Sequence, residues 1–159
     1  MLINVAVASA VTGLSRIHMS YFKNNPLFKL YYSDTDSAFT DVDLKDIEPN
    51  LIGSELGQLK LEYEFLEAVF LGPKIYGGIT LDGKSIVKAK GVKNIIPYED
   101  LKSLLQKGGK LKIPNEKWYR NLTEGNIKIK QEIYNLAVHS SKRELIYNEK
   151  GLLVGTKPL

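Results

Sequence analysis

The chain has 159 residues, of which 43% are hydrophobic and 25% charged, a composition that indicates a folded globular protein and excludes a disordered or fibrous one. It holds no cysteine, which excludes disulfide bonds, thiolate metal ligands and a cysteine nucleophile, and its two histidines argue against a metal site built from several histidines. The net charge of +4 is unevenly distributed, because the chain carries 7 basic and 11 acidic residues up to Val87 but 15 basic and 7 acidic residues from Lys88 onward. An acidic half followed by a basic half suggests a site for cations beside a surface for polyanions.

The first predicted element is a helix over residues 3–21. Its apolar residues recur at three- and four-residue steps and share one face; they are Ile3, Val7, Val11, Leu14, Ile17 and Tyr21. A signal peptide is an alternative reading, but no Lys or Arg precedes the apolar stretch, which is also short. No stretch of the chain approaches the length of a membrane span. The helix begins without a capping signal, as though the chain started inside a domain, and we expect its apolar face to be exposed.

Strands are predicted next, at residues 27–32 and 38–40, on either side of the polar segment 33–37. Two short strands about a polar turn indicate a β-hairpin. Residues 59–65 then show the clearest alternation of apolar and charged side chains in the chain, which predicts a half-buried strand. Such a strand needs neighbours in a sheet.

The second half is predicted to be mostly β-structure. A short helix over residues 98–107 begins after Pro97 and ends at Gly108-Gly109. Runs of strands with interspersed helices favour an α+β fold with an antiparallel sheet. The strands predicted here are residues 68–71, 74–81, 85–89, 127–133 and 145–154, the last of which turns at residues 148–151.

Residues 78–85 satisfy the pattern G-x-x-x-x-G-K-[ST] of a phosphate-binding loop. Such a loop needs a strand before it and a helix after it, so that the helix N-terminus faces the phosphates. Here strand-like segments lie on both sides of Asp82-Gly83, which is a strong hairpin signal. We therefore reject an ATP site.

Several other polar residues are assigned ordinary roles. His18 and His139 are isolated and fit a helix face or the surface. Asp41 and Asp43 could extend an acidic site, but they fit solvated loop carboxylates better. Residues 121–123 match a glycosylation sequon, although nothing indicates secretion.

The most specific signal is the acidic turn at residues 31–37, with the sequence Tyr-Tyr-Ser-Asp-Thr-Asp-Ser. At a tight hairpin Asp34 and Asp36 can converge and hold Mg²⁺, which prefers oxygen ligands. The alternative is a turn rich in Asp, Ser and Thr because these residues hydrogen-bond to their own backbone. The chemistry alone favours neither reading. The aromatic and aliphatic strand at residues 30–32 favours the metal site, because it would make a rigid platform for the turn.

The acidic turn resembles the Y-x-D-T-D-S signature, motif C, of the palm of family B DNA polymerases. The helix upstream, with Ala10 and residues 15–18, looks like the palm helix that follows the fingers in these enzymes. Residues 73–76, Pro-Lys-Ile-Tyr, resemble the K-x-Y motif that contacts the primer end, and residues 88–91 resemble the basic segment after it. The last five residues are similar to the C-terminus of the organellar, linear-plasmid branch, which is protein-primed. The resemblance covers essentially the whole chain.

The resemblance implies a role for each matching residue. Asp36 is expected to be a direct metal ligand, and Asp34 to lie nearer the primer terminus as a weaker ligand or through water. In the family two Mg²⁺ ions bridge the incoming triphosphate and the primer oxygen. Tyr32, Thr35 and Ser37 are expected to support the motif.

The resemblance also implies contacts with the DNA primer-template. Lys74 is expected to bind a primer phosphate and Tyr76 to pack against the terminal nucleotide. Lys88 and Lys90 are expected to neutralise phosphates without regard to sequence. In this reading the acidic half of the chain holds the metals and the basic half holds the duplex.

The fold implied is an antiparallel palm sheet with a packed helix, followed by a mixed, β-rich thumb. Residues 1–92 are assigned to the C-terminal part of the palm and residues 93–159 to a thumb-like basic region. The chain lacks the D-x-x-S-L-Y-P aspartate motif, the lysine-bearing fingers helix and the proofreading domain, which lie upstream in the family. We expect a palm-and-thumb fragment of a DNA-directed DNA polymerase that is inactive alone, because it lacks a metal-bridging carboxylate.

The expected partners are DNA, deoxynucleoside triphosphates, a terminal protein as primer and the missing N-terminal portion, with no membrane. The resemblance to the plasmid branch implies a mitochondrial location. Three readings stay open at this point. The chain is a piece of an active polymerase, a non-functional remnant of an integrated plasmid, or a DNA-binding module that does not catalyse.

Overall fold

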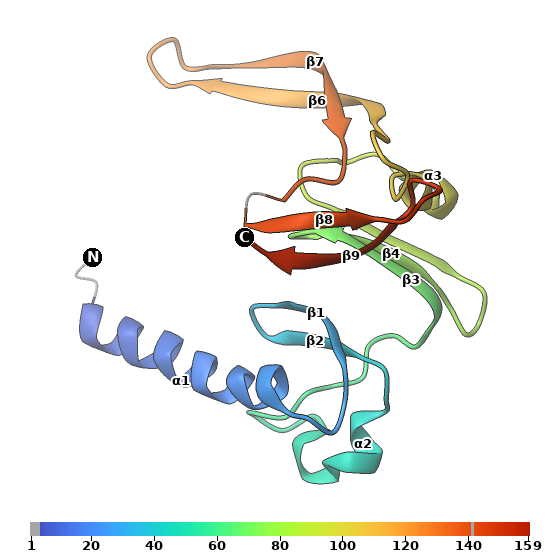
Figure 1. Ribbon diagram of the computed structural model, residues 1–159. Helices are drawn as coiled ribbons and strands as arrows, with labels where there is room; N and C mark the ends of the chain where they lie inside the picture. The colour runs from blue at the N-terminus through green and yellow to red at the C-terminus, as the bar shows by residue number, and fades with distance from the viewer. Residues whose placement is uncertain (1–3, 141) are drawn as a thin grey trace. The chain divides into compact units, whose positions relative to one another are not determined.

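The computed structural model describes residues 4–140 and 142–159 and has an α+β fold whose named strands pair antiparallel within each sheet (Figure 1). This confirms the predicted class. The chain divides into two compact units, the first ending at Tyr63 and the second beginning at Glu64. The predicted boundary between palm and thumb at residues 92 and 93 concerns function and stays a prediction.

The first unit opens with the predicted helix, α1, which spans Val5–Asn24. The expectation that it begins without a cap is wrong, because the Asn4 side chain accepts a hydrogen bond from the backbone N–H of Val7 at 3.1 Å. Asparagine is a good N-cap because its side-chain oxygen satisfies a backbone donor that has no partner within the helix. The predicted start at residue 3 lies outside the described residues.

Most of α1 is exposed, as expected for its apolar face. Val11 is 62% exposed, Leu14 67% and Ile17 69%. The buried side chains of the helix, Met19 and Phe22, lie in its last two turns. In the described part of the chain, no helix has both the length and the apolar character that crossing a membrane requires.

The predicted acidic hairpin is present and packs near this end of the helix. Strand β1 spans Leu30–Asp34 and β2 spans Ser37–Thr40. The short helix α2, Leu44–Ile47, and the 3-10 turn η1, Pro49–Leu51, follow. The core of the first unit is formed by Met19, Phe22, Phe28 and Leu44.

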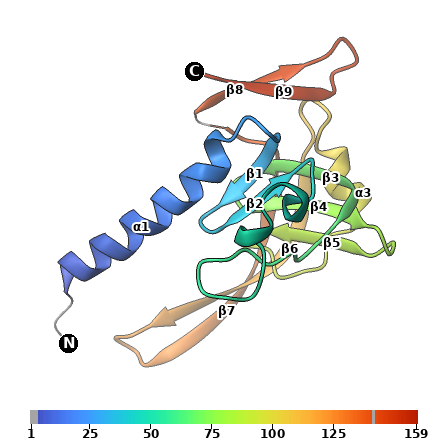
Figure 2. The ribbon, with the colours of Figure 1, turned by 90° about the horizontal axis from the view of Figure 1, so that it is seen from below.

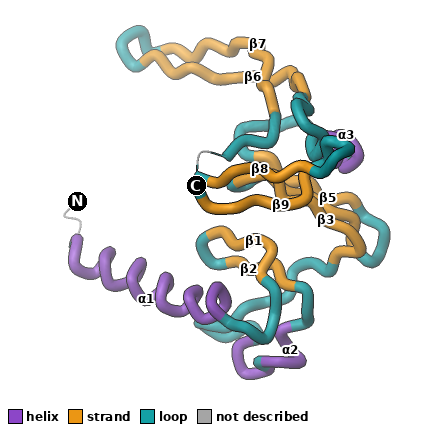
Figure 3. The backbone as a smooth tube through the Cα atoms, in the orientation of Figure 1, coloured by secondary structure: helices purple, strands orange, loops and turns teal. Residues whose placement is uncertain are grey.

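The strand predicted at residues 59–65 is wrong for most of its length. Leu59 forms an isolated bridge with Ile52, residues 60–64 lie outside any strand, and β3 begins only at Phe65 (Figure 3). Leu61 is 55% exposed. Alternation predicts a strand only where another strand supplies the hydrogen-bond ladder, and in the described residues no strand pairs with this segment.

The second unit is built on the three-stranded sheet β3–β4–β5, formed by Phe65–Gly72, Ile75–Thr80 and Ser85–Ala89. All three strands are predicted ones: β3 is longer than predicted at both ends, β4 is one residue shorter at each end, and β5 has the predicted bounds. Helix α3, Tyr98–Ser103, contributes to the core of the unit and is shorter than predicted. After α3 the chain pairs with a distant segment: the Leu105 carbonyl oxygen accepts from the N–H of Leu153 at 2.9 Å, and the N–H of Lys107 donates to the carbonyl oxygen of Gly151 at 2.8 Å. The buried residues of this core are Val69, Leu71, Ile96, Tyr98, Leu101, Leu104 and Leu136.

The structure confirms that residues 78–85 form a hairpin and no phosphate-binding loop. Strands β4 and β5 are joined by a tight turn, in which Gly83 has a φ of 79°. The Lys84 ammonium and the Thr80 hydroxyl both donate to Asp82 and lower the pKa of its carboxyl to about 2. Since strand β5 follows the turn in place of a helix, no helix N-terminus faces a phosphate there.

Two further two-stranded ribbons complete the second unit (Figure 2). Strand β6, Leu111–Asn121, pairs with β7, Asn126–Leu136, and β8, Arg143–Tyr147, pairs with β9, Leu153–Pro158. The predicted strands at 127–133 and 145–154 fall within β7 and the β8–β9 hairpin. The sequence analysis missed strand β6. Pro114 interrupts its alternation of side chains, and a proline argues against a strand because it has no N–H to donate to the ladder.

Two adjacent glycines in β4 allow close packing on both faces of the sheet. A methyl group on Gly77 would lie 2.8 Å from the carbonyl oxygen of Ile86 and 2.9 Å from Leu101 Cδ2 of α3. A methyl group on Gly78 would lie 2.5 Å both from the Glu67 carbonyl oxygen and from a ring carbon of Phe65. Because backbone oxygens cannot rotate away, each position requires glycine.

We predict that Gly77→Ala lowers the free energy of unfolding by about 1–3 kcal/mol, the usual cost of overpacking a core. Urea denaturation followed by circular dichroism measures this change. Gly155→Ala is the matched control, since a methyl group there meets no atom within 4 Å. An equal loss of stability in both variants would show that the close approach at Gly77 is not the cause.

Candidate metal and nucleic-acid sites

The turn that carries the two aspartates is a tight, two-residue connection. Asp34 ends β1 and pairs with Ser37, which begins β2, so Thr35 and Asp36 form the turn itself. Thr35 has a φ of 49°, an uncommon conformation for a β-branched residue. A residue held in this region stores strain, and such strain is often found at functional sites.

Side chains of the motif hold the turn together. The Ser37 hydroxyl donates to the backbone carbonyl oxygen of Asp34 at 3.0 Å, and the Thr35 hydroxyl donates to Asp34 Oδ1 at 3.2 Å. Below the turn, the rings of Tyr32 and Phe39 face each other across the strands at 5.7 Å in an edge-to-face arrangement. Asp36 is left exposed at the tip of the turn.

The two carboxylates of the turn are the candidate metal ligands. The carboxylates of Asp34 and Asp36 are hard oxygen donors of the kind that Mg²⁺ prefers. Ser33 directly precedes Asp34. Its hydroxyl is buried and has no hydrogen-bond partner among the described residues. Within residues 4–140 and 142–159, no three Asp, Glu, His or Cys side chains gather closely enough to hold a metal ion. The carboxylates of Asp34 and Asp36 alone are therefore a partial donor set for Mg²⁺.

The neighbouring acidic residues have structural roles, in line with the prediction that they are loop carboxylates. Asp41 Oδ1 accepts a hydrogen bond from the backbone N–H of Lys29 at 2.8 Å, at the open end of the hairpin. Asp43 is the N-cap of α2 and accepts from the backbone N–H of Lys45 at 2.9 Å.

The four residues expected to contact DNA gather at one end of the β3–β4–β5 sheet. Lys74 lies in the turn between β3 and β4 with a φ of 60°. Tyr76 lies directly opposite Lys88 across β4 and β5. The backbone N–H of Lys90 donates to the carbonyl oxygen of Lys74 at 3.0 Å. We call Lys74, Tyr76, Lys88 and Lys90 the strand-end cluster.

Side chains alternate between the two faces along β4 and β5, and this determines the face on which Tyr76 and Lys88 lie. Ile75 packs against the core that includes α3, so Tyr76 and Lys88 occupy the other face of the sheet. Strand β3 flanks β4 on the side away from β5, and its Phe70 lies directly opposite Tyr76. The centroids of these two rings are 6.1 Å apart. The three lysines are exposed and Tyr76 is half-buried. The arrangement offers ammonium groups around a tyrosine that is anchored by an aromatic neighbour.

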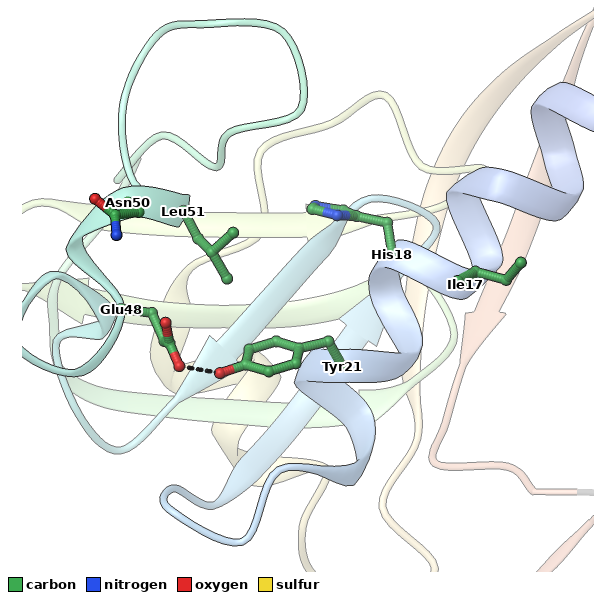
Figure 4. Close-up of a pocket in the computed structure, with 6 residues that line it drawn as sticks. All are labelled: Ile17, His18, Tyr21, Glu48, Asn50 and Leu51. Atoms are coloured by element: carbon green, nitrogen blue, oxygen red, sulfur yellow. Dashed lines mark hydrogen bonds between the residues drawn. The ribbon is translucent and has the colours of Figure 1, made fainter.

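A pocket of about 340 Å³ lies within the first unit, lined by α1 and the segment that contains η1 (Figure 4). The Tyr21 hydroxyl donates to Glu48 across it, and this bond raises the pKa of Tyr21. His18 is half-buried beside Phe22, as predicted for a helix-face histidine. The hydrogen bond between Tyr21 and Glu48 thus links α1 to the residue that precedes η1. The remaining lining residues of the pocket are Ile17, Asn50 and Leu51.

The sequence analysis missed two features of these sites. Phe70 was not connected with Tyr76, because only the register of β3 and β4 shows that they are neighbours. The lysines of β6 and β7 were assigned to a basic region without being placed on a face. The alternation of Ile and Lys at residues 127–130 is the signal that could have placed them.

Comparison with known proteins identifies relatives in fungi. The chain is 40% identical over 132 aligned residues to a protein of Neurospora intermedia named "Probable DNA polymerase", a match that covers 80% of the chain. Proteins of the same name from Ascobolus immersus and Podospora anserina are 36% and 38% identical, and each match covers 98% of the chain.

The chain spans only 13–14% of the length of these relatives. No family model matches it. No solved structure matches it either.

Proposed function

Since this chain is related by sequence to fungal proteins named probable DNA polymerase, we propose that it is the C-terminal palm-and-thumb part of a family B, protein-primed DNA polymerase. The single observation that supports this most strongly is the tight hairpin turn, in which Thr35 and Ser37 hold Asp34 and leave Asp36 exposed. The match to the relatives over nearly the whole chain supports the same reading.

In this proposal Asp36 and Asp34 hold Mg²⁺ at the tip of the turn. Bound there, the metal would stabilise the charge on the triphosphate of an incoming deoxynucleotide and on the primer oxygen. The chain itself contributes a rigid turn, because the Ser37 and Thr35 hydrogen bonds fix the backbone on which the carboxylates stand. Pre-organised ligands lower the cost of assembling a metal site.

The strand-end cluster would bind the primer-template duplex. Exposed ammonium groups on Lys74, Lys88 and Lys90 suit phosphate oxygens, which give contacts without sequence preference. Tyr76, held by Phe70, would pack against the terminal nucleotide.

The remaining parts of the polymerase are proposed to come from a portion that precedes this segment. The exposed apolar side chains of α1, among them Val11, Leu14 and Ile17, suit burial against that portion, because large exposed apolar patches mark interaction sites. A terminal protein primer and a mitochondrial location stay predictions. A DNA-binding module without catalysis is the second candidate function, which the exposed lysines of the strand-end cluster favour; a remnant without function also stays open.

Metal binding by the turn can be tested with Mn²⁺ as a paramagnetic probe. We expect Mn²⁺ to broaden the backbone amide signals of residues 33–37 in an NMR spectrum of the full chain, and Asp36→Asn to remove most of this broadening. Asp82→Asn is the matched control, since Asp82 is also a turn carboxylate but is bound by Lys84 and Thr80. Broadening at residues 33–37 that persists in Asp36→Asn would contradict the metal site.

Primer extension tests whether the chain is only a part of the polymerase. We expect no templated extension by the purified chain with Mg²⁺ and deoxynucleotides, because the described residues supply only two clustered carboxylates and loss of positioned groups lowers rates by orders of magnitude. Templated extension that Asp36→Asn abolishes would overturn the expectation that a further portion is needed.

Duplex binding tests the strand-end cluster. We expect the double variant Lys88→Gln, Lys90→Gln to weaken binding of the chain to all duplex sequences alike and to reduce the slope of log K against log salt by about 2, or about 1 per phosphate contact. Fluorescence anisotropy with duplexes of unrelated sequence measures both quantities. An effect confined to one sequence would exclude phosphate contacts as the cause.

A further inference from the structure

The acidic hairpin carries an irregularity between its turn and its open end. Tyr32 pairs with Phe39. The next pair toward the open end is Leu30 and Thr40, so two steps along β1 match a single step along β2. The extra residue is Tyr31, which forms a β-bulge and is 52% exposed. Because one extra residue shifts the alternation of a strand by one position, the place of the bulge in β1 decides how the turn is oriented relative to the core.

Asp41 closes the open end of the hairpin just beyond this bulge. Its backbone N–H donates to the carbonyl oxygen of Lys29 at 3.3 Å, and its Oδ1 accepts from the backbone N–H of Lys29 at 2.8 Å. The carboxylate thus supplies an acceptor that a backbone carbonyl would supply in a continued ladder. Lys29 Nζ also lies over the ring of Tyr31, 4.8 Å from its centroid. We call Asp41, Lys29 and Tyr31 the hairpin clasp.

The hairpin clasp lies where the two strands leave the core of the first unit. Phe28, the residue before Lys29, is 8% exposed. Leu44, in the short helix that follows Asp41, is 9% exposed. Both belong to the core that includes the end of α1. The clasp therefore ties the strands together between the packed part of the unit and the part that carries the turn.

A regular ladder would not join the hairpin clasp to the tight turn. Counted from the turn, an unbroken ladder would place Leu30 opposite Asp41. In the structure Lys29 bonds to Asp41 instead, because the bulge takes up one residue of β1. Loss of the bond from the Asp41 carboxylate to Lys29 would therefore allow β1 to slip by one residue and lose the bulge.

The other regular ladder would change the turn itself. Counted from the clasp without a bulge, Ser33 would lie opposite Ser37. The turn would then contain residues 34–36, and Asp34 would move from the end of β1 into the turn. A hairpin of two short strands is only marginally stable by itself, so a constraint at its open end matters for its register.

Asp41 is too far from the turn to be a metal ligand there. Four steps of extended strand separate it from Ser37, which is about 13 Å along β2. Ligand oxygens lie about 2 Å from Mg²⁺. This separation excludes the alternative in which Asp41 extends the acidic site as a further ligand. Any effect of Asp41 on a metal at the turn must pass through the strands.

We propose that Asp41 is a positioning residue for the acidic turn. Its bond to the backbone N–H of Lys29 keeps the bulge at Tyr31 and so fixes the two-residue turn that carries both aspartates. This role rests on the proposed function, in which the two aspartates hold Mg²⁺. It needs an acceptor at the position of Oδ1 and no negative charge, because the donor is a neutral backbone amide.

Two mild variants of Asp41 separate the position of the acceptor from the charge. Asp41→Asn keeps an oxygen acceptor at the same position and removes the charge, whereas Asp41→Glu keeps the charge and moves the acceptor by one methylene group. Binding is measured in the full chain by the broadening that Mn²⁺ causes at the amide signals of residues 33–37. We expect Asp41→Asn to bind Mn²⁺ as the unaltered chain does and Asp41→Glu to bind it several-fold more weakly. The reverse order would make charge the cause and overturn the proposal.

The register of the hairpin is measured in the same samples without metal. We expect nuclear Overhauser effects between Leu30 and Thr40 in the unaltered chain, and their loss in Asp41→Glu and Asp41→Ala. Asp43→Ala is the matched control, since Asp43 also accepts a backbone N–H, at 2.9 Å, but lies outside the hairpin. It should change neither the pairing nor the affinity for Mn²⁺. Urea denaturation identifies the folded variants, and a folded Asp41→Ala that keeps the contact between Leu30 and Thr40 would overturn the role of Asp41.

The Mn²⁺ titration also separates the positioning role from the proposed function. If Mn²⁺ broadens residues 33–37 equally in the unaltered chain and in every folded variant of Asp41, the positioning role is excluded and the proposed metal site stands. If Mn²⁺ causes no broadening in the unaltered chain, the proposed metal site fails and the positioning role fails with it.

Discussion

The close approach permitted by Gly77 and Gly78 is the constraint on which the second unit depends. Leu101 of α3 reaches the sheet over Gly77, and the ring of Phe65 covers Gly78 on the other face. A slip of one residue in this sheet would exchange its two faces. Tyr76 would then be turned toward α3 instead of lying beside Lys88. The packing that stabilises the core therefore also determines which side chains form the strand-end cluster.

The acidic turn depends on a different and more local set of interactions. Its geometry comes from two strands of four and five residues, the hydrogen bonds of Thr35 and Ser37 to Asp34, and the ring pair below them. The division of charge along the chain corresponds to this difference between the units. The first unit holds two turn carboxylates, whereas the second presents the lysines of the strand-end cluster at one end of a sheet. The proposed metal site and the proposed duplex contact need these opposite charges.

Much of the fold could be predicted from local signals. The polar segment 33–37 between apolar strands and the Asp82-Gly83 pair between β4 and β5 are turn signals that require no distant partner. The prediction failed where pairing with a strand elsewhere in the chain decides whether a segment becomes a strand. Residues 60–64 alternate as a strand does, but no described strand pairs with them. Strand β6 contains Pro114 and forms nevertheless, because β7 supplies a ladder along its whole length. At the start of α1, a cap by Asn4 was overlooked although its residue type allows it.

The sequence by itself determined which residue types carry the chemistry, that the chain turns back at residues 33–37, 82–83 and 148–151, and that the basic residues collect in the second half. Only the tertiary structure decided which of these residues meet. Tyr76, Lys88 and Phe70 become neighbours through strand register, and Lys90 reaches Tyr134 although 44 positions separate them. The physical reason is that turns and alternation follow from local backbone preferences. Register and packing instead depend on contacts between segments far apart in the chain, which a periodic pattern does not specify.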